Sequence, residues 1–65
     1  MSENIKEFKI NKKTLSLYKI SEMYYIRMDE DTNNMYFFLH ETKDFDEAEF
    51  IFDEFQKVYE YIGNL

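Results

Sequence analysis

The chain of 65 residues contains no cysteine, no proline and no tryptophan, and it has one glycine and one histidine. Because cysteine is absent, no disulfide can stabilise the fold and no thiolate can bind a metal. The single histidine, His40, removes most zinc chemistry as well, since zinc sites depend on cysteine and histidine. No proline-rich or low-complexity stretch marks a linker, so we expect one domain over residues 1–65.

Long apolar runs are also missing. No stretch approaches the roughly 20 apolar residues of a membrane-spanning helix. The first residues, MSENIKEFKI, lack the apolar stretch of a signal peptide. Together with the absence of cysteine, these features predict a cytoplasmic protein of a bacterium or of a phage-infected host, with no membrane partner.

Aromatic residues are abundant instead. Seven phenylalanines and six tyrosines make up 20% of the chain. Each such ring can bury roughly 150–250 Å². A chain of this length is near the lower limit for an independent core. The aromatic content therefore predicts a folded, globular protein rather than a disordered one.

The first 39 residues show the period-2 alternation of β-strands joined by short polar turns. The strands are expected within residues 8–10, 14–18, 23–28 and 35–39. The stretch 29–34 is too polar for anything but a loop, and Asn33-Asn34 suits its tip. The last strand is apolar on both faces, which predicts a central position and a cover on its second face.

The rest of the chain predicts a helix. Asp44 and Glu47 match a capping box, with Thr42 as an alternative cap, and Gly63 suits the residue that ends the helix. An apolar stripe follows helical spacing: Ala48, Ile51, Phe52, Phe55, Val58, Tyr59 and Ile62. The predicted fold is α+β, with a four-stranded antiparallel sheet followed by one C-terminal helix packed on one face (β-β-β-β-α).

One helix can cover only one face of such a sheet. Met23, Tyr25, Tyr36 and Phe38 would then offer apolar surface on the other face. Soluble proteins rarely expose large patches of this kind. We therefore expect a homodimer or higher symmetric oligomer that associates through these residues. The alternative is a monomer whose tyrosine hydroxyls hydrate that face.

Charge is divided unevenly along the chain. Residues 1–28 contain six basic and three acidic residues, a net charge of +3, whereas residues 29–65 contain two basic and eleven acidic residues, a net charge of −9. Carboxylates spaced along a helix can approximate a phosphate backbone and bind a basic channel. The alternative is that they only keep the protein soluble. The candidate partner-binding residues are Asp46, Glu47, Glu49, Asp53, Glu54, Glu60, Asp29, Glu30 and Asp31.

The basic N-terminal half predicts the opposite partner. Basic side chains close to tyrosines can track a single nucleic-acid strand whose bases stack on the rings. The candidate residues are Lys9, Lys12, Lys13, Tyr18, Lys19, Tyr25 and Arg27. Four strands and one helix within residues 8–62 resemble the small single-strand-binding fold of a eukaryotic transcriptional coactivator, which dimerises through its helix. The net charge of −6 argues against bulk binding to nucleic acid.

No motif in the sequence is specific enough to indicate a catalytic site. Asp29, Asp31 and Asn33 are spaced like the first ligands of a calcium loop, but Asn34 stands at the glycine position and His40 at the position of the bidentate glutamate. A solvated hairpin tip is the better interpretation. No serine is marked as a nucleophile for His40, and no glycine-rich loop is present to hold phosphate. We expect no enzyme, no cofactor and no metal.

Small size, acidic and aromatic composition and the absence of cysteine are similar to phage-encoded inhibitors of host defence, including anti-CRISPR proteins and DNA mimics. The leading hypothesis is therefore a stoichiometric binding protein, an inhibitor from a phage or mobile element. Its acidic helix face would contact a host protein with a basic nucleic-acid-binding surface. A nucleic-acid-binding module is the second hypothesis, and a self-associating structural or assembly protein is the third.

Overall fold

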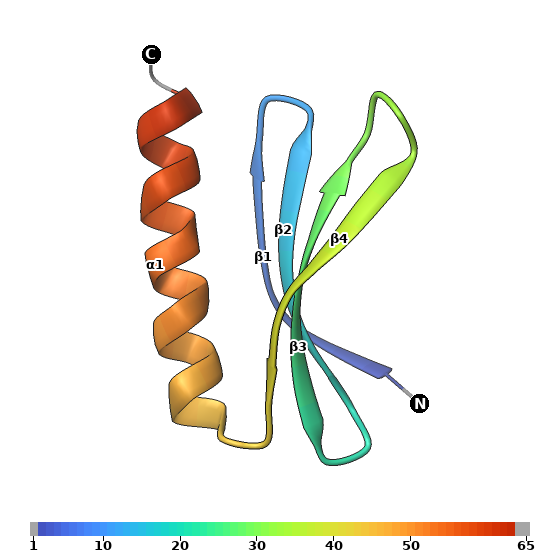
Figure 1. Cartoon of the computed structure of the whole chain (residues 1–65), viewed down its shortest axis with the longest axis vertical. Helices are drawn as coiled ribbons and strands as arrows, with labels where there is room; N and C mark the ends of the chain where they lie inside the picture. Colours follow the sequence, from blue (N-terminus) through green and yellow to red (C-terminus); the bar gives the residue numbers. More distant parts are fainter. Residues whose placement is uncertain (1, 64–65) are drawn as a thin grey trace.

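A computed structural model describes residues 2–63 of the chain. They form the strands β1 (Ser2–Ile10), β2 (Lys13–Ile20), β3 (Met23–Glu30) and β4 (Met35–Thr42), followed by the helix α1 (Phe45–Gly63). The strands make one antiparallel sheet in the order β1-β2-β3-β4, and α1 forms a second layer beside it (Figure 1). The predicted β-β-β-β-α arrangement is confirmed. No helix within residues 2–63 is long and apolar enough to cross a membrane.

Short turns make this sheet a meander. Two-residue turns join β1 to β2 and β2 to β3, and residues 31–34 join β3 to β4. Asn11, Ser21 and Asn34 have positive φ angles of 55°, 58° and 58°. Asparagine tolerates this conformation better than most residues, whereas serine has no such advantage. The chain therefore makes its left-handed turn positions without glycine.

The predicted position of β4 was wrong. It lies at an edge of the sheet and not in the centre, because every strand pairs with its neighbour in sequence. The apolar side chains on both faces of β4 are therefore not fully covered by other residues of the described chain. Four consecutive side chains are about half exposed, at 48–59%: Met35, Tyr36, Phe37 and Phe38.

All four strands are longer than predicted, and two of the differences affect candidate residues or the sheet edge. The first strand begins at Ser2, well before the expected start at Phe8, and contains a register irregularity between Asn4 and Lys6. The third strand continues to Glu30, so only Asp31 of the three expected acidic loop residues lies in the turn. Polar residues in these segments are compatible with strands because they pair along the backbone while one of their faces stays in water.

The core lies between the central strands and the first half of α1. Leu15 and Leu17 of β2 and Ile26 of β3 are at most 1% exposed. They pack against Ala48 and Phe52 of the helix. Partly buried side chains surround this cluster: Ile5, Phe8, Tyr24, Leu39, Ile51, Phe55 and Tyr59.

The apolar stripe of the helix is buried only in part. Val58 and Ile62 are 53% and 55% exposed, although both were expected to face the sheet. Gly63 is the last helical residue and does not have positive φ, so it is not the left-handed cap that the sequence suggested. Its role is steric: a Cβ atom there would lie 2.8 Å from Cγ1 of Ile10. Glycine thus allows the end of α1 to approach the end of β1.

Asp44 caps the helix as expected. Its Oδ1 accepts hydrogen bonds from the backbone N–H groups of Asp46 at 2.9 Å and Glu47 at 3.4 Å. Thr42 supports the cap, since its Oγ1 accepts the N–H of Asp44 at 3.1 Å. That contact occupies the N–H that Glu47 would accept in a full capping box. The side chain of Glu47 instead lies 2.8 Å from Nε2 of His40 on β4.

Truncation of Phe52 and of Phe50 should distinguish a core aromatic residue from a surface one. We expect Phe52→Ala to lower the free energy of unfolding by about 3–5 kcal/mol, because it leaves a cavity between the two layers. This loss is comparable to the whole stability of a small domain. Phe50→Ala is the matched control, since Phe50 is 65% exposed and should lose no more than about 0.5 kcal/mol. Urea unfolding followed by circular dichroism measures both, and equal losses would contradict the core assignment.

The turn between β2 and β3 offers a stabilising substitution. Ser21 holds a φ of 58°, which costs free energy for a residue with a Cβ atom. We expect Ser21→Gly to raise the free energy of unfolding by roughly 0.5–1 kcal/mol, the net of relieved strain and greater freedom of the unfolded chain. Ser16→Gly is the control, because Ser16 lies in the middle of β2 and should be destabilised by glycine.

Candidate interaction surface

The sheet face opposite α1 carries a group of aromatic side chains. Residues directly opposite each other on neighbouring antiparallel strands point to the same face. Tyr18 lies opposite Tyr25, and Arg27 lies opposite Phe38, so all four are on the face that the helix does not cover. We call the set Tyr18, Tyr25, Arg27, Tyr36 and Phe38 the aromatic face.

The rings of the aromatic face form a continuous series of contacts across three strands. Tyr18 and Tyr25 stack with centroids 5.5 Å apart and planes inclined by 22°. Tyr25 meets Phe38 edge-on at 6.1 Å, and Phe38 meets Tyr36 edge-on at 5.6 Å. Such arrangements fix ring orientation. Tyr36 and Phe38 remain 57% and 59% exposed, so the series presents a preordered apolar surface.

Arg27 lies between two of these rings. Its guanidinium carbon is 5.4 Å from the centroid of Tyr18 and 5.3 Å from that of Tyr36. Nη2 donates a hydrogen bond to Oδ2 of Asp29 at 3.1 Å. The Nε atom is buried and lies 3.1 Å from Oδ1 of Asp29, in an ion pair that lacks hydrogen-bond alignment. The cation is therefore held by aromatic faces and by one carboxylate.

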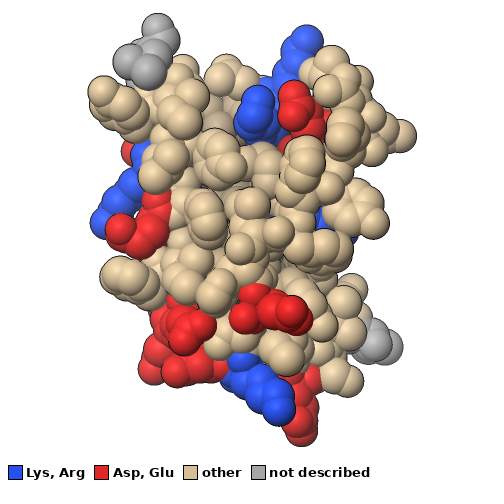
Figure 2. All heavy atoms as spheres, viewed as in Figure 1, with Lys and Arg blue, Asp and Glu red and all other residues tan. Residues whose placement is uncertain are grey.

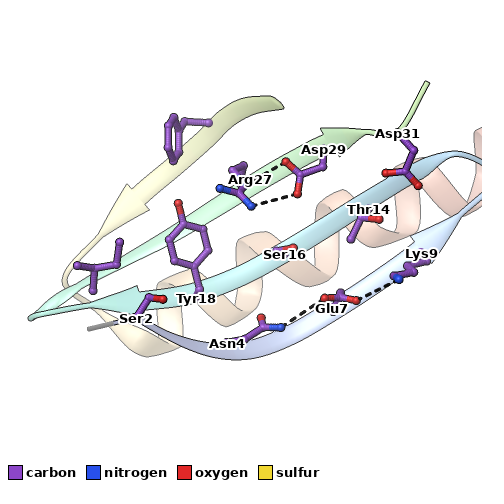
Figure 3. Close-up of a pocket in the computed structure, with 12 residues that line it drawn as sticks. Ser2, Asn4, Glu7, Lys9, Thr14, Ser16, Tyr18, Arg27, Asp29 and Asp31 are labelled. Carbon is purple, nitrogen blue, oxygen red and sulfur yellow. Dashed lines mark hydrogen bonds and ion pairs between the residues drawn. The ribbon is translucent and has the colours of Figure 1, made fainter. Parts of the chain in front are cut away.

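A shallow hollow of about 620 Å³ extends from the aromatic face toward β1 (Figure 3). Glu7 and Lys9 of β1, Thr14 and Ser16 of β2, and Asp31 of the third turn are among its lining residues. Its charged lining consists of two basic and three acidic residues, so it is not a positive groove. Burial raises the pKa of Tyr18, and the nearby Arg27 offsets part of that rise, so the hydroxyl stays protonated at neutral pH.

The nine candidate acidic residues do not form one surface. Asp29 lies on the aromatic face, on the side of the sheet away from α1, while Glu30 points to the other side and pairs with Lys13 at 3.9 Å. Six of the nine form ion pairs: Asp29, Glu30, Glu47, Glu49, Asp53 and Glu54. Among residues 2–63, Asp31, Asp46 and Glu60 form none.

Two helix carboxylates share one lysine of β1. Nζ of Lys6 lies 3.3 Å from Glu49 and 3.4 Å from Asp53, and it is also 5.8 Å from the ring centroid of the buried Phe52. Burial disfavours the charge of Lys6, but the hydrogen bonds and charges of Glu49 and Asp53 outweigh it and raise the pKa of Lys6. These carboxylates therefore form a link between the helix and β1.

In the view of Figure 2, acidic side chains gather at the end where α1 begins, whereas the centre of that face is uncharged. In the middle of the helix an acidic and a basic side chain also pair, since Nζ of Lys57 lies 3.1 Å from Glu54. The helix thus offers a smaller continuous acidic surface than its sequence suggests.

The candidate nucleic-acid-binding residues are divided between the two sides of the sheet. Lys9, Tyr18, Tyr25 and Arg27 share the uncovered side. Lys12 is in the first turn, and Lys13 and Lys19 point to the helix side. Nζ of Lys19 lies 5.5 Å from the ring centroid of Tyr24, which packs on the core. The basic residues therefore do not follow one strand-binding track.

The other sequence motifs take structural positions. His40 of β4 pairs with Glu47 of α1 and so ties the edge strand to the start of the helix. Asn34 adopts the left-handed conformation at the hairpin tip. Within residues 2–63 no group of three or more histidine, aspartate or glutamate residues is arranged to hold a metal ion.

Sequence reasoning missed the exposure of Met35 and Phe37, which lie on the helix side of β4. The signal was present: the turns after β1 and β2 are too short for anything but hairpins, which predicts a meander and places the last strand at an edge. Reasoning from the double-sided apolar pattern alone placed it in the centre.

Comparisons with models of protein families, with curated proteins and with solved structures find no match. The function is therefore argued from the geometry of this chain.

The Lys6 contacts predict a pH dependence. We expect Lys6→Met to lower the free energy of unfolding by about 1 kcal/mol or less near neutral pH, since partly exposed ion pairs contribute little and the methionine keeps the apolar stem. The folded-state pKa of Lys6 is raised above 10.5, so its contribution is complete below that pH and is lost as the pH rises through the folded-state value.

Urea unfolding of wild type and Lys6→Met between about pH 7 and pH 11.5 measures the difference. It should be constant at lower pH and shrink above 10.5. Lys9→Met is the control, because Lys9 is 72% exposed and should show a small difference at every pH. A Lys6 difference that grows with pH would contradict the account.

Proposed function

We propose that this protein acts by stoichiometric binding of another protein, and that the aromatic face is the contact surface. The observation that carries the proposal is the exposure of Tyr36 and Phe38 beside Arg27, on a face with no cover in the described chain. Tyrosine and arginine are the residue types that dominate binding energy in protein interfaces, and Phe is enriched there. Their mutual contacts fix them before binding, which lowers the entropy cost of association.

The proposal is of binding and not of catalysis. The single histidine, His40, is engaged with Glu47 on the helix side of the sheet. Ser16, the buried serine, points to the other side, opposite Arg27. Ser16 and His40 therefore lie on opposite sides of the sheet and do not form a nucleophile–base pair with each other.

The charges around the aromatic face suggest the chemistry of the partner. Glu7, Asp31 and Glu41 lie at its margins, and Asp29 neutralises Arg27 within it. A complementary partner has an apolar patch bordered by lysine or arginine. Nucleic-acid-handling proteins have basic surfaces of this kind. We therefore propose more specifically that the protein is a phage or mobile-element inhibitor of such a host protein. Its main contact surface would be the aromatic face rather than the acidic helix.

Nucleic acid is the second candidate partner. The stacked pair Tyr18 and Tyr25 lies on the same side as Lys9 and Arg27, which favours base stacking. Lys13 and Lys19, however, point to the other side of the sheet, and the hollow contains acidic residues that would repel phosphate. Both observations favour a protein partner.

The test compares three variants in capture from a lysate of the cells that encode the protein, with and without nuclease. The captured protein is then purified and its affinity measured by calorimetry. We expect the double variant Tyr36→Ala/Phe38→Ala to weaken binding at least tenfold, the effect of losing about 1.4 kcal/mol or more of contact energy. The matched control Phe50→Ala/Tyr61→Ala removes two aromatic rings, 65% and 69% exposed, from the outer helix and should bind within twofold of wild type.

A third variant, Asp46→Lys/Glu60→Lys, tests the acidic helix. If it abolishes binding while Tyr36→Ala/Phe38→Ala binds normally, the aromatic face is not the contact surface and the acidic helix is. If the lysate yields nucleic acid and no protein, and nuclease removes the captured material, the proposal of a protein partner is wrong.

A further inference from the structure

The two edges of the sheet differ in the features that prevent edge-to-edge association. Natural sheets protect edge strands with charged side chains, prolines or bulges. The edge strand β1 carries Glu3, Lys6, Glu7 and Lys9 and an irregularity in its register. The edge strand β4 also contains a register irregularity, between Phe38 and His40, but it has no charged residue and no proline from Met35 to Leu39. In the described chain, β1 is therefore protected and the first half of β4 is not.

We infer that β4 pairs with β4 of a second copy of this chain, in antiparallel orientation about a twofold axis near Phe37. The two four-stranded sheets would then form one continuous sheet. Such pairing supplies partners for the backbone N–H and C=O groups along the free edge of β4. The interface is isologous, because both copies contribute the same strand.

The sequence of β4 is self-complementary about this axis. Phe37 faces Phe37 of the second copy, Tyr36 faces Phe38, and Met35 faces Leu39. Each of these pairs joins side chains on the same side of the sheet, since Tyr36 and Phe38 share the uncovered side and Phe37 points to the helix side. Aromatic pairs directly opposite each other stabilise antiparallel strands. No pair in this stretch places like charges together.

Charge complements the contact at its ends. Lys43 follows β4 and forms no ion pair within residues 2–63. Antiparallel pairing centred on Phe37 brings Lys43 beside the turn of the second copy that carries Asp31. Asp31 likewise has no ion pair within the same residues.

The exposed area agrees with a contact of this kind. Met35, Tyr36, Phe37 and Phe38 are each 48–59% exposed. Half of three aromatic rings and one methionine amounts to roughly 400 Å² exposed on each protomer, and strand pairing covers the part of it that faces the second copy. The backbone of the edge and the adjacent turns add to this. A patch of this size is already near the largest that monomeric proteins expose.

The inferred dimer is tested first by its mass. Light scattering at about 100 μM should give twice the monomer mass of 8.1 kDa for wild type. Phe37→Lys places a charge opposite its own copy and should weaken the dimer at least tenfold, so that the mass falls toward the monomer value. Met35→Lys serves as a second variant if Phe37→Lys fails to fold by circular dichroism. Phe50→Lys is the control and should stay dimeric, because Phe50 lies on the helix.

The axis is tested by cross-linking. The chain has no cysteine, so a single introduced thiol reports only on its own position. Opposite Cβ atoms in an antiparallel pair lie about 4.5–5.5 Å apart, close to what a disulfide requires. Phe37→Cys should therefore form a disulfide-linked dimer under mild oxidation, whereas Phe50→Cys should form at least tenfold less.

These results also separate the inference from its competitors. A wild-type chain that is monomeric at 100 μM overturns the inferred dimer and leaves the edge to a strand of another protein. If Phe37→Lys is still dimeric and Phe37→Cys does not cross-link, the chain dimerises through another surface and the inferred β4 pairing is wrong. Phe37 points to the helix side, whereas Tyr36 and Phe38 point to the uncovered side, so Phe37→Lys disrupts the dimer without removing a side chain of the aromatic face. A Phe37→Lys variant that is monomeric and still binds the captured protein separates the failure of the dimer from the failure of the partner-binding proposal.

Discussion

A single helix can cover only one face of a four-stranded sheet, and most features of this protein follow from that constraint. The core forms where α1 lies over β2 and β3, around Phe52, Leu17 and Ile26. Outside this region the chain still has more aromatic side chains than two layers can bury. They are arranged in order, stacked on the uncovered side of the sheet and along the β4 edge. This surplus is the physical basis for proposing that the protein works by association.

The uneven charge of the sequence has a structural role. A lysine of the first strand meets the acidic helix in the folded protein, where Lys6 lies between Glu49 and Asp53. His40 and Glu47 make a second link between sheet and helix. Three of the nine acidic residues that suggested a mimic of nucleic acid, Glu47, Glu49 and Asp53, thus link the two layers. Asp31 in the third turn forms no ion pair within residues 2–63 and lines the hollow beside the aromatic face, where it can contribute specificity for a basic partner.

The fold could be predicted because its signals are local. Alternation defined the strands, and Asp44 and the apolar spacing defined the helix. The edge position of β4 was missed because a strand with apolar residues on both faces has the same sequence pattern in the centre of a sheet and at an edge. Asp29 and Glu30 were assigned to a loop because polar residues at a strand end resemble a turn. The surroundings of Arg27 depend on pairing between strands, which no local pattern contains. The shared location of Tyr25, Tyr36 and Phe38 followed from alternation and was predictable.

Backbone hydrogen exchange at two protein concentrations tests most directly whether association covers the apolar surface that α1 leaves exposed. The amides of β4 and β1 both lie on edge strands, so β1 is an internal reference. The account predicts that the amides of residues 35–39 that point to the free edge exchange at least tenfold more slowly at about 500 μM than at about 5 μM, while the edge-facing amides of β1 are unchanged. Exchange in β4 that is as fast as in β1 and independent of concentration would contradict it.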